Sequence, residues 1–577
     1  MTELSRFVWE TRYRDGDARP PENSIADTWN RVADAVAAVE SAPALWKERF
    51  LAILRDFRFL PGGRILAGAG TVREVTLFNC FVMGLIDDSI EGIFEALKEG
   101  AVTMQHGGGV GYDFSTLRPR GSRARSSGTI ASGPVSFMRV WDAMCATILS
   151  TGARRGAMMA TLRCDHPDIE EFVDAKRAPE ALRHFNLSVL VTDAFMQAVK
   201  DDAEWPLVFR GDVAADGGHA SKIVRARGIW DRICHSAYDC AEPGVLFIDR
   251  INAANNLGYC EQLSATNPCG EEPLPPYGAC NLGSINLTAF VIDPFASGAR
   301  FDLDAIRDTA RVAVRFLDNV IETSKFPLFR QREQARRSRR IGLGITGLAD
   351  ALAMLRLRYD SESARSAAAQ VMRVLRDAAY EASIALARER GAFPHFEADA
   401  YLQRPFVRAL PPEMQAAIAR HGIRNSHLLA IAPAGTISLL ANNVSSGIEP
   451  IFGVHTLRRV LHFDGTYRNF KTTDFAYESW RGGQPAQAAL PDFFVDADDV
   501  AARDHLLMQA ALQPFVDGAI SKTINLQRDM PVEDLPEIFE SAFALGLKGC
   551  TVFRVATRPS VIAERCDQDP VRETDRP

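Results

Sequence analysis

The sequence lacks long hydrophobic runs, an excess of basic residues and closely spaced cysteines. None of its apolar runs reaches the roughly 18 to 20 residues that a membrane-spanning helix needs. The charged start, MTELSRFVWETRYRDGD, has no apolar signal core, so we expect a cytoplasmic protein without a membrane anchor. A net charge of −7 argues against broad binding to nucleic-acid backbones, which favour basic surfaces.

The ten cysteines are too sparse in a chain of 577 residues to form a disulfide scaffold. No C-x-x-C and no H-x-x-x-H pattern occurs, which leaves structural zinc sites and thioredoxin-type motifs without support. We therefore expect no bound metal. Any redox pair must combine cysteines that are distant in the sequence.

Short apolar segments alternate with helical periodicity along most of the chain. Ile25, Trp29, Val32 and Val36, for example, are three or four residues apart, which predicts a packed helix near the N-terminus. No internal repeat or long linker is evident. The alternation of strands and helices predicts an α/β architecture around a sheet or a barrel.

The stretch SATNPCGEEPLPPYGACNLGSINL, residues 264–287, carries an amide, a thiol and a carboxylate at every second position. In an extended segment the side chains of Asn267, Cys269 and Glu271 would share one face. Pro268 and Gly270 between them indicate a stiff loop tip that other groups approach closely. A lone cysteine is more often an ordinary small buried residue. The alignment of three functional groups weakens that interpretation, and one reaction centre could be built from their shared face.

Four other segments could bind anions. QHGGGVGYDFS suggests a phosphate loop, but no Lys-Ser/Thr follows and the G-x-G-x-x-G spacing fails at Tyr112, so we favour a turn. Arginines beside glycines in 117–128 and 150–162 could close on phosphates, although for these segments alone a solvated basic loop is favoured. The turn Gly435-Thr436-Ile437-Ser438 offers amides and hydroxyls, which is a weak signal by itself.

Taken together, these motifs resemble the catalytic subunit of ribonucleotide reductases, in particular the adenosylcobalamin-dependent class II enzymes. The resemblance covers nearly the whole chain and keeps the family's order. It rests on FNC (78–80), QHGGGVGYDFSTLRPRGS, HPDIEEF, NPCGE (267–271), ACNLGSINL (279–287), PAGTIS, SGIEPIF, ISKTINL and LGLKGCTVFR.

The resemblance implies a ten-stranded α/β barrel with a central finger loop that carries the radical cysteine, Cys269. That residue would abstract the 3′-hydrogen of a bound ribonucleotide, with Glu271 as general base on the 3′-hydroxyl and Asn267 hydrogen-bonded to the sugar. Cys80 and Cys280 match the reducing pair, which becomes a disulfide as the 2′-hydroxyl leaves as water. Their spacing in the sequence could not have paired them.

The resemblance also implies binding sites for a substrate and an effector. Asn79 matches a contact to the ribose. The substrate phosphates would be held by Pro433, Ala434, Gly435, Thr436, Ile437 and Ser438. A deoxynucleoside triphosphate effector would be bound by Asp87, Ser89, Arg118 and Arg125, and the loop with Arg155 would relay its identity to the substrate base. Such sites usually lie at a dimer interface, so we expect a homodimer.

The class of ribonucleotide reductase is inferred from motifs that the sequence lacks. Class I enzymes pass the radical through adjacent C-terminal tyrosines, whereas the last tyrosine here is Tyr477 and no Tyr-Tyr occurs. The tail also offers no match to the glycyl-radical loop of class III. Adenosylcobalamin is thus the expected radical source, and diphosphates are the expected substrates. The alternatives are a class I-type subunit that depends on a separate radical-generating partner, and a non-catalytic nucleotide-binding regulatory subunit.

We expect three parts along the chain: an N-terminal helical region (1–60), the catalytic barrel with its effector loops (61–555) and a flexible C-terminal tail (556–577). The N-terminus does not match the ATP-binding cone of some family members. The tail carries Cys566 alone, where the family usually has a cysteine pair. The disulfide would then be reduced by an external dithiol or thioredoxin-type reductant, or by a partner chain that supplies the missing C-terminal cysteines.

Overall fold

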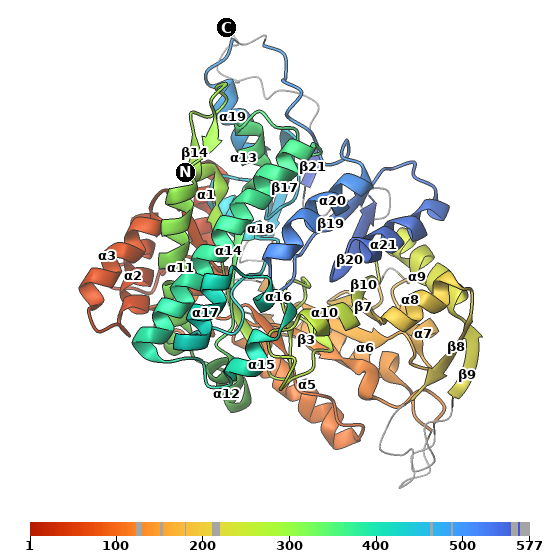
Figure 1. Cartoon of the computed structure of the whole chain (residues 1–577). Helices are drawn as coiled ribbons and strands as arrows, with labels where there is room; N and C mark the ends of the chain where they lie inside the picture. Colours follow the sequence, from red (N-terminus) through yellow and green to blue (C-terminus); the bar gives the residue numbers. More distant parts are fainter. Residues whose placement is uncertain are drawn as a thin grey trace.

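A large mixed sheet forms the centre of the computed structural model, and three N-terminal helices pack at one side of it (Figure 1). These helices are α1 (Glu3–Arg12), α2 (Ile25–Ala37) and α3 (Pro43–Leu54). Trp29, Val32 and Val36 on α2 are buried, as their spacing predicts. The structure describes residues 1–122, 130–150, 154–178, 180–209, 220–461, 466–485, 488–554 and 563–565.

The sheet has ten strands in two parallel sets that run in opposite directions. Strands β2, β3, β6, β7 and β10 form one set; β13 with β16, and β19 with β20, form the other. Antiparallel pairs β2–β13 and β10–β20 join the sets, and β1 pairs with β13. The bounds are β1 Phe59–Pro61, β2 Cys80–Val82, β3 Gly109–Asp113, β6 Met158–Arg163, β7 Phe185–Val191, β10 Gly244–Phe247, β13 Ala279–Asn286, β16 Ile341–Thr346, β19 Thr523–Leu526 and β20 Gly549–Arg554.

The two ends of this sheet are connected through residues 428–431. Leu429 bridges to Leu343 on β16, and Ile431 bridges to Ile520, just before β19. The backbone of this short segment therefore fills the gap between the terminal strands. The α/β class and the ten strands predicted from the resemblance are confirmed.

Helices between the parallel strands cover the sheet, whose strands are almost entirely buried. Strands that are covered on both faces are rich in apolar residues, as β6, β7 and β16 are. No helix in the described ranges has both the length and the apolar character to cross a bilayer. The principal helices are α5 Ile90–Gln105, α6 Pro134–Thr147, α9 Ala226–Cys240, α11 Leu303–Thr323, α14 Glu362–Arg390, α20 Ala502–Leu512 and α21 Leu535–Ala544.

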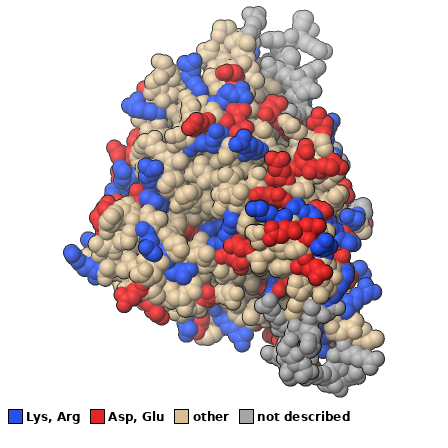
Figure 2. Space-filling model, turned by 45° about the vertical axis from the view of Figure 1, so that its right-hand side comes forward, with Lys and Arg blue, Asp and Glu red and all other residues tan. Residues whose placement is uncertain are grey.

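Smaller sheets lie outside the ten-stranded sheet. Strands β17 (His455–Leu461) and β18 (Tyr467–Thr473) form a small sheet with β21 (Ala563–Arg565), which lies within the expected tail. Most of that tail, including Cys566, lies outside the described residues. Figure 2 shows acidic and basic side chains interspersed on the face that it draws, without one broad area of either sign.

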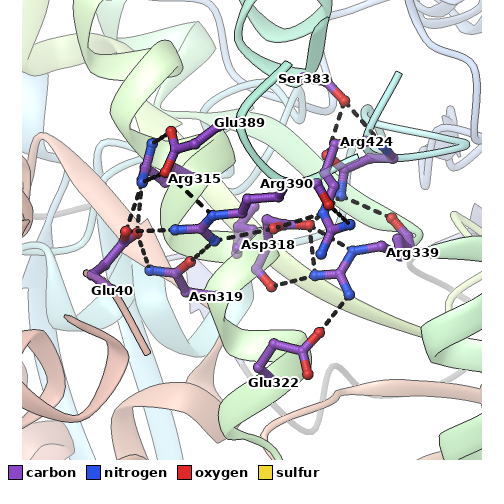
Figure 3. A network of polar contacts seen from close by, with 12 residues as sticks. Glu40, Arg315, Asp318, Asn319, Glu322, Arg339, Ser383, Glu389, Arg390 and Arg424 are labelled. Carbon is purple, nitrogen blue, oxygen red and sulfur yellow. Dashed lines mark hydrogen bonds and ion pairs between the residues drawn. The ribbon is translucent and has the colours of Figure 1, made fainter. Parts of the chain in front are cut away.

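A buried network of charged side chains ties the N-terminal helices to the barrel (Figure 3). Glu40, which follows α2, accepts hydrogen bonds from Arg315 Nε at 2.7 Å and from Asn319 Nδ2 at 2.7 Å, both on α11. Arg390 at the end of α14 donates to the same carboxylate. Burial alone would raise the pKa of Glu40, but the hydrogen bonds from Arg315, Asn319 and Arg390 outweigh it and lower the pKa to about 2.

The network continues on α11 towards β16. Asp318 Oδ1 accepts hydrogen bonds from Arg339 Nη2 at 2.8 Å and from Asn425 Nδ2 at 2.9 Å. Ser383 on α14 in turn donates to Asn425 Oδ1 at 2.9 Å. Because Arg339 lies two residues before β16, the network fixes the start of that strand against α11 and α14.

We predict that Glu40→Gln lowers the free energy of unfolding by about 3 to 5 kcal/mol near neutral pH, because it removes the buried charge that pairs with both Arg315 and Arg390. The folded-state pKa is depressed from 4.5, so this stabilisation is complete above about pH 5 and is lost as the pH falls towards 2. Denaturant unfolding at about pH 7 and about pH 3 measures the difference. An equal deficit at both pH values would contradict the account. Glu413→Gln, at an exposed position, is the control.

Candidate active site

A short hairpin places the predicted reaction centre inside the sheet. It consists of β11 (Ala265–Thr266) and β12 (Pro273–Leu274), joined by residues 267–272. Asn267 N donates to Glu272 O at 3.2 Å, and Glu272 N donates to Asn267 Oδ1 at 3.0 Å, which closes the base of the loop. Asn186 on β7 holds the tip by donating to Pro268 O at 2.7 Å.

The prediction of an extended segment over residues 267–271 is wrong. Gly270 N donates to Asn267 O at 3.1 Å, and Gly270 has a φ of +84°, so the tip is a tight turn. The positive φ explains the glycine, since other residues are strained there. Asn267, Cys269 and Glu271 nevertheless line one cavity, because the turn brings them together.

That cavity has a volume of about 290 Å³ and is called the cysteine cavity below. Besides the hairpin, its wall includes Asn79 and Cys80 at the start of β2, Gly109 at the start of β3, and Ala157 just before β6. Pro433, Ala434, Gly435, Thr436 and Ile437 form another part of the wall. Ser438 is buried behind it, where its hydroxyl and that of Thr346 are 2.9 Å apart.

The structure pairs the two predicted reducing cysteines. Cys80 on β2 and Cys280 on β13 are directly opposite partners in the antiparallel register. Such partners have Cα atoms about 4.5 to 5.5 Å apart, which lies within the range that a disulfide spans. Both thiols are free and buried. Cys80 lines the cysteine cavity, whereas Cys280 lies behind it.

Polar contacts connect Cys80 to the hairpin. Its sulfur accepts a hydrogen bond from Asn267 Nδ2 at 3.1 Å, and its thiol donates to Glu271 Oε1 at 3.7 Å. Glu271 Oε2 and Asn79 Oδ1 are buried and have no hydrogen-bond partner among the described residues. Buried polar atoms without partners are costly. Two of them on the wall of one cavity therefore favour a ligand that donates hydrogen bonds.

Burial controls the protonation of the site. It raises the pKa of Cys269, Cys80 and Cys280, and the neighbouring carboxylates raise these values further. Burial also raises the pKa of Glu271, against hydrogen bonds from Asn267 and Cys80. Although protein surrounds Cys269, part of its surface is accessible, because its thiol faces the cavity. All three cysteines are thus thiols, not thiolates, at neutral pH.

Two features of the site could not be anticipated from the motifs. Arg64, in the segment after β1, is the single arginine or lysine among the described residues on the wall of the cysteine cavity. A larger cavity of about 930 Å³ lies beyond the hairpin, at the carboxyl ends of β3, β6 and β7. Its wall includes Asp113, Arg163, Thr192, Ser264 and Pro275. The hairpin thus separates two cavities at opposite ends of the same strands.

Of the predicted effector residues, Asp87 and Ser89 lie at the start of α5, and Arg118 reaches that helix start from a later segment. Ser89 caps the helix, accepting from Gly92 N at 3.0 Å, and its hydroxyl donates to Asp87. Arg118 Nε donates to Asp88 Oδ2 at 2.7 Å. Arg125 lies outside the described residues, and only the backbone of Arg155 is described, in β5 (Arg154–Arg155).

Comparison with known proteins supports the motif analysis. A family model of the ribonucleotide reductase barrel domain matches residues 78–553, and one of the all-alpha domain of the same proteins matches residues 1–74. The chain belongs to the ribonucleotide reductase family, which confirms the predicted resemblance at that level.

Several curated relatives align over most of the chain. A "Vitamin B12-dependent ribonucleoside-diphosphate reductase" of Mycobacterium tuberculosis is 40% identical over 98% of this chain and 81% of its own length. A protein of the same description from Thermoplasma acidophilum is 37% identical over 92% of this chain and 68% of its own length. A "Vitamin B12-dependent ribonucleotide reductase" of Streptomyces coelicolor is 29% identical over 84% of this chain and 57% of its own length.

We predict that mild oxidation of the purified chain forms an intramolecular disulfide between Cys80 and Cys280, because the sheet register makes them cross-strand partners. Peptide mass spectrometry after alkylation of the remaining thiols identifies the pair. Cys280→Ser should abolish the linked peptide, and Cys234→Ser, at a buried helical position remote from the sheet register, should not. A dominant disulfide between other cysteines would contradict the geometry.

Proposed function

We propose that this chain reduces ribonucleoside diphosphates to 2′-deoxyribonucleotides through a thiyl radical on Cys269, with adenosylcobalamin as the radical source. One observation carries the proposal: Cys269, Cys80, Glu271 and Asn79 meet on the wall of one cavity whose buried oxygens lack partners. The vitamin B12-dependent relatives named above support the choice of cofactor and of diphosphates.

Each side chain has a task that its position allows. The ribose lies against the hairpin, with Glu271 Oε2 and Asn79 Oδ1 accepting hydrogen bonds from its hydroxyls. The Cys269 radical takes the hydrogen from C3′, and Glu271 accepts the 3′-hydroxyl proton. Cys80 and Cys280 then supply two electrons and two protons, so that the 2′-hydroxyl leaves as water and a disulfide forms. Cys269 recovers its hydrogen at the end of the cycle.

The phosphates are held by the segment that starts at Pro433. Gly435 faces open space, with no atom within 4 Å of the place that a Cβ would occupy, so a ligand reaches its backbone freely. Thr436 adds a hydroxyl on the same wall. Arg64 supplies positive charge to the cavity. A diphosphate across this wall places its ribose over Cys269.

The larger cavity fits a corrin cofactor. Its wall combines apolar groups such as Leu190 and Pro275 with amides of Asn252, Gln262 and Gln334, which suits a flat macrocycle with amide arms. When bound there, adenosylcobalamin supplies a radical by homolysis of its cobalt–carbon bond. The hairpin then keeps Cys269 between cofactor and substrate and excludes water from the cysteine cavity.

Regulation is proposed at α5. Asp87, Ser89 and Arg118 form a polar group for a deoxynucleoside triphosphate, and Arg155 is followed directly by Gly156 and Ala157 on the wall of the cysteine cavity. Effector binding near Arg155 therefore reaches the substrate base through adjacent backbone. Ile90 and Phe94 on α5 are 59% and 49% exposed, which favours burial against a second copy in a homodimer.

We predict that Cys269→Ser abolishes deoxynucleotide formation but keeps nucleotide binding, because it removes the radical carrier and little volume. Glu271→Gln should bind substrate and slow the reaction by about 10² to 10⁴, the usual cost of losing a positioned base. Product analysis and equilibrium binding of a nucleoside diphosphate measure both effects. Turnover by Cys269→Ser would overturn the proposed role, and an unchanged rate in Glu271→Gln would assign the base elsewhere.

We predict that Ala194→Trp weakens binding of cobalamin at least tenfold without changing nucleotide affinity, because Ala194 is exposed on the wall of the larger cavity, where an indole would fill space. Changes in the visible spectrum of the cofactor report its binding. The matched control, Thr436→Trp, fills the cysteine cavity and should have the opposite effect: weaker nucleotide binding and unchanged cobalamin affinity. Equal cobalamin affinity in Ala194→Trp and the wild type would place the cofactor elsewhere.

A further inference from the structure

Glu272, the residue after the proposed general base, has no part in the chemistry described so far. Its side chain is only 3% exposed and lies outside the wall of the cysteine cavity. Space for it exists because residue 342 on β16 is a glycine, where a Cβ would lie 2.4 Å from Glu272 Oε1. Glu272 Oε1 has no hydrogen-bond partner among the described residues. A buried carboxyl in a space kept by a glycine calls for an explanation.

The two adjacent glutamates face different cysteines. Glu271 accepts a hydrogen bond from Cys80, as described above. Glu272 lies beside Cys280. Its Oε1 lies against Gly342 on β16, whose register partner on β13, Leu282, is two residues from Cys280. Burial raises the pKa of the Cys280 thiol, and the Glu272 carboxyl raises it further. The Cys280 thiol donates to Asn281 O at 3.4 Å. Because Cys80 and Cys280 are cross-strand partners, each sulfur of the proposed disulfide has its own carboxyl.

The surroundings of Glu272 favour its neutral form. Burial is the largest effect on its pKa, which rises to about 8. Near neutral pH the group is therefore a carboxylic acid that can donate a proton to sulfur. The charged and titratable groups around it are Cys280, Glu271, Arg340 before β16, Asp517 before β19 and Lys548 before β20.

A reductant reaches the two sulfurs unequally. Cys80 lies on the wall of the cysteine cavity, whereas Cys280 is 0% exposed and lies behind it. An incoming thiolate therefore attacks Cys80, and Cys280 is the leaving sulfur. A thiolate is strongly disfavoured there, because burial and the adjacent carboxyls raise the pKa of Cys280 well above 9. Breaking the disulfide in this direction requires an acid beside Cys280.

We propose that Glu272 is this acid and protonates Cys280 when the Cys80–Cys280 disulfide is reduced. The inference rests on the proposed function, which supplies the disulfide. One thiolate of an external dithiol forms a bond to Cys80 Sγ as the Cys80–Cys280 bond breaks, and the electron pair on Cys280 Sγ takes the proton of Glu272. The second thiol of the dithiol then displaces Cys80, passes its proton to it and closes the oxidised dithiol. Glu272 regains from solvent the proton that the first thiol released.

The test follows the reduction of the preformed disulfide and needs neither nucleotide nor cofactor. Oxidised wild-type chain and Glu272→Gln are treated with dithiothreitol across a pH series, quenched with iodoacetamide, and the Cys80 and Cys280 peptides are quantified. Rates are corrected for the thiolate fraction of the reductant. Glu413→Gln is the matched control at an exposed site.

The corrected wild-type rate should be level at neutral pH and should fall above about pH 8. Glu272→Gln should reduce about 10²-fold more slowly at neutral pH, a typical effect of losing a positioned acid, and should lack that fall. Glu272→Asp, which keeps an acid at a slightly different position, should recover part of the rate together with the fall. Because Lys548 also has a pKa lowered to about 8, the difference between variants, not the wild-type profile alone, decides the matter.

A wild-type rate and profile in Glu272→Gln would overturn the proposal. If Glu272→Gln unfolds under the assay conditions, Glu272→Asp decides the matter. A reduction rate equal to that of the wild type at all pH values would overturn the proposal, because a shorter side chain moves the acid away from Cys280. Failure of the proposed function would look different, since the wild-type chain would then form no deoxynucleotide although its disulfide is reduced normally.

Discussion

The close approach of the β11–β12 hairpin to strand β3 is the constraint on which the site depends. A Cβ at residue 111 would lie 1.8 Å from Thr266 O, so only glycine admits the hairpin at this depth. Held there, the hairpin separates the cysteine cavity from the larger cavity and places Cys269 on the wall of the cysteine cavity. A side chain at residue 111 would push the hairpin out of the sheet and merge the two compartments.

Buried ionisable groups are charged in the network around Glu40 and neutral at the cysteines. In the network around Glu40 and Asp318, charges are paired with arginines, and the pKa of Glu40 is lowered, so the ion pairs hold α2, α11 and β16 in place. Around the cysteines few cations are present, and burial keeps the thiols protonated and raises the pKa of the neighbouring carboxyls of Glu271 and Glu272. Hydrogen-atom transfer from sulfur requires neutral thiols, and a raised pKa makes a carboxylate a stronger proton acceptor. The charged network thus maintains the frame in which a neutral reaction centre operates.

Much of the fold followed from sequence, because local periodicity decides which faces are buried. The stripe of Trp29, Val32 and Val36 is an example. The set Asn267, Cys269 and Glu271 was also found, but for a wrong reason: the glycine at 270 makes a turn rather than a straight strand. Spacing could not pair Cys80 with Cys280, since their register depends on how the whole sheet assembles; the family resemblance supplied that pairing. Glu272 gave no signal, because the space beside it is created by Gly342, 70 residues further along the chain.

The central claim is that one chain brings ribonucleotide, dithiol and adenosylcobalamin together around the hairpin. Its most direct test is an assay of the purified chain with a ribonucleoside diphosphate, a small dithiol and adenosylcobalamin, and with each of them omitted in turn. The account predicts 2′-deoxynucleotide only in the complete mixture, with several products per chain. Equal product without adenosylcobalamin, or none in the complete mixture while nucleotide and cofactor both bind, would contradict it.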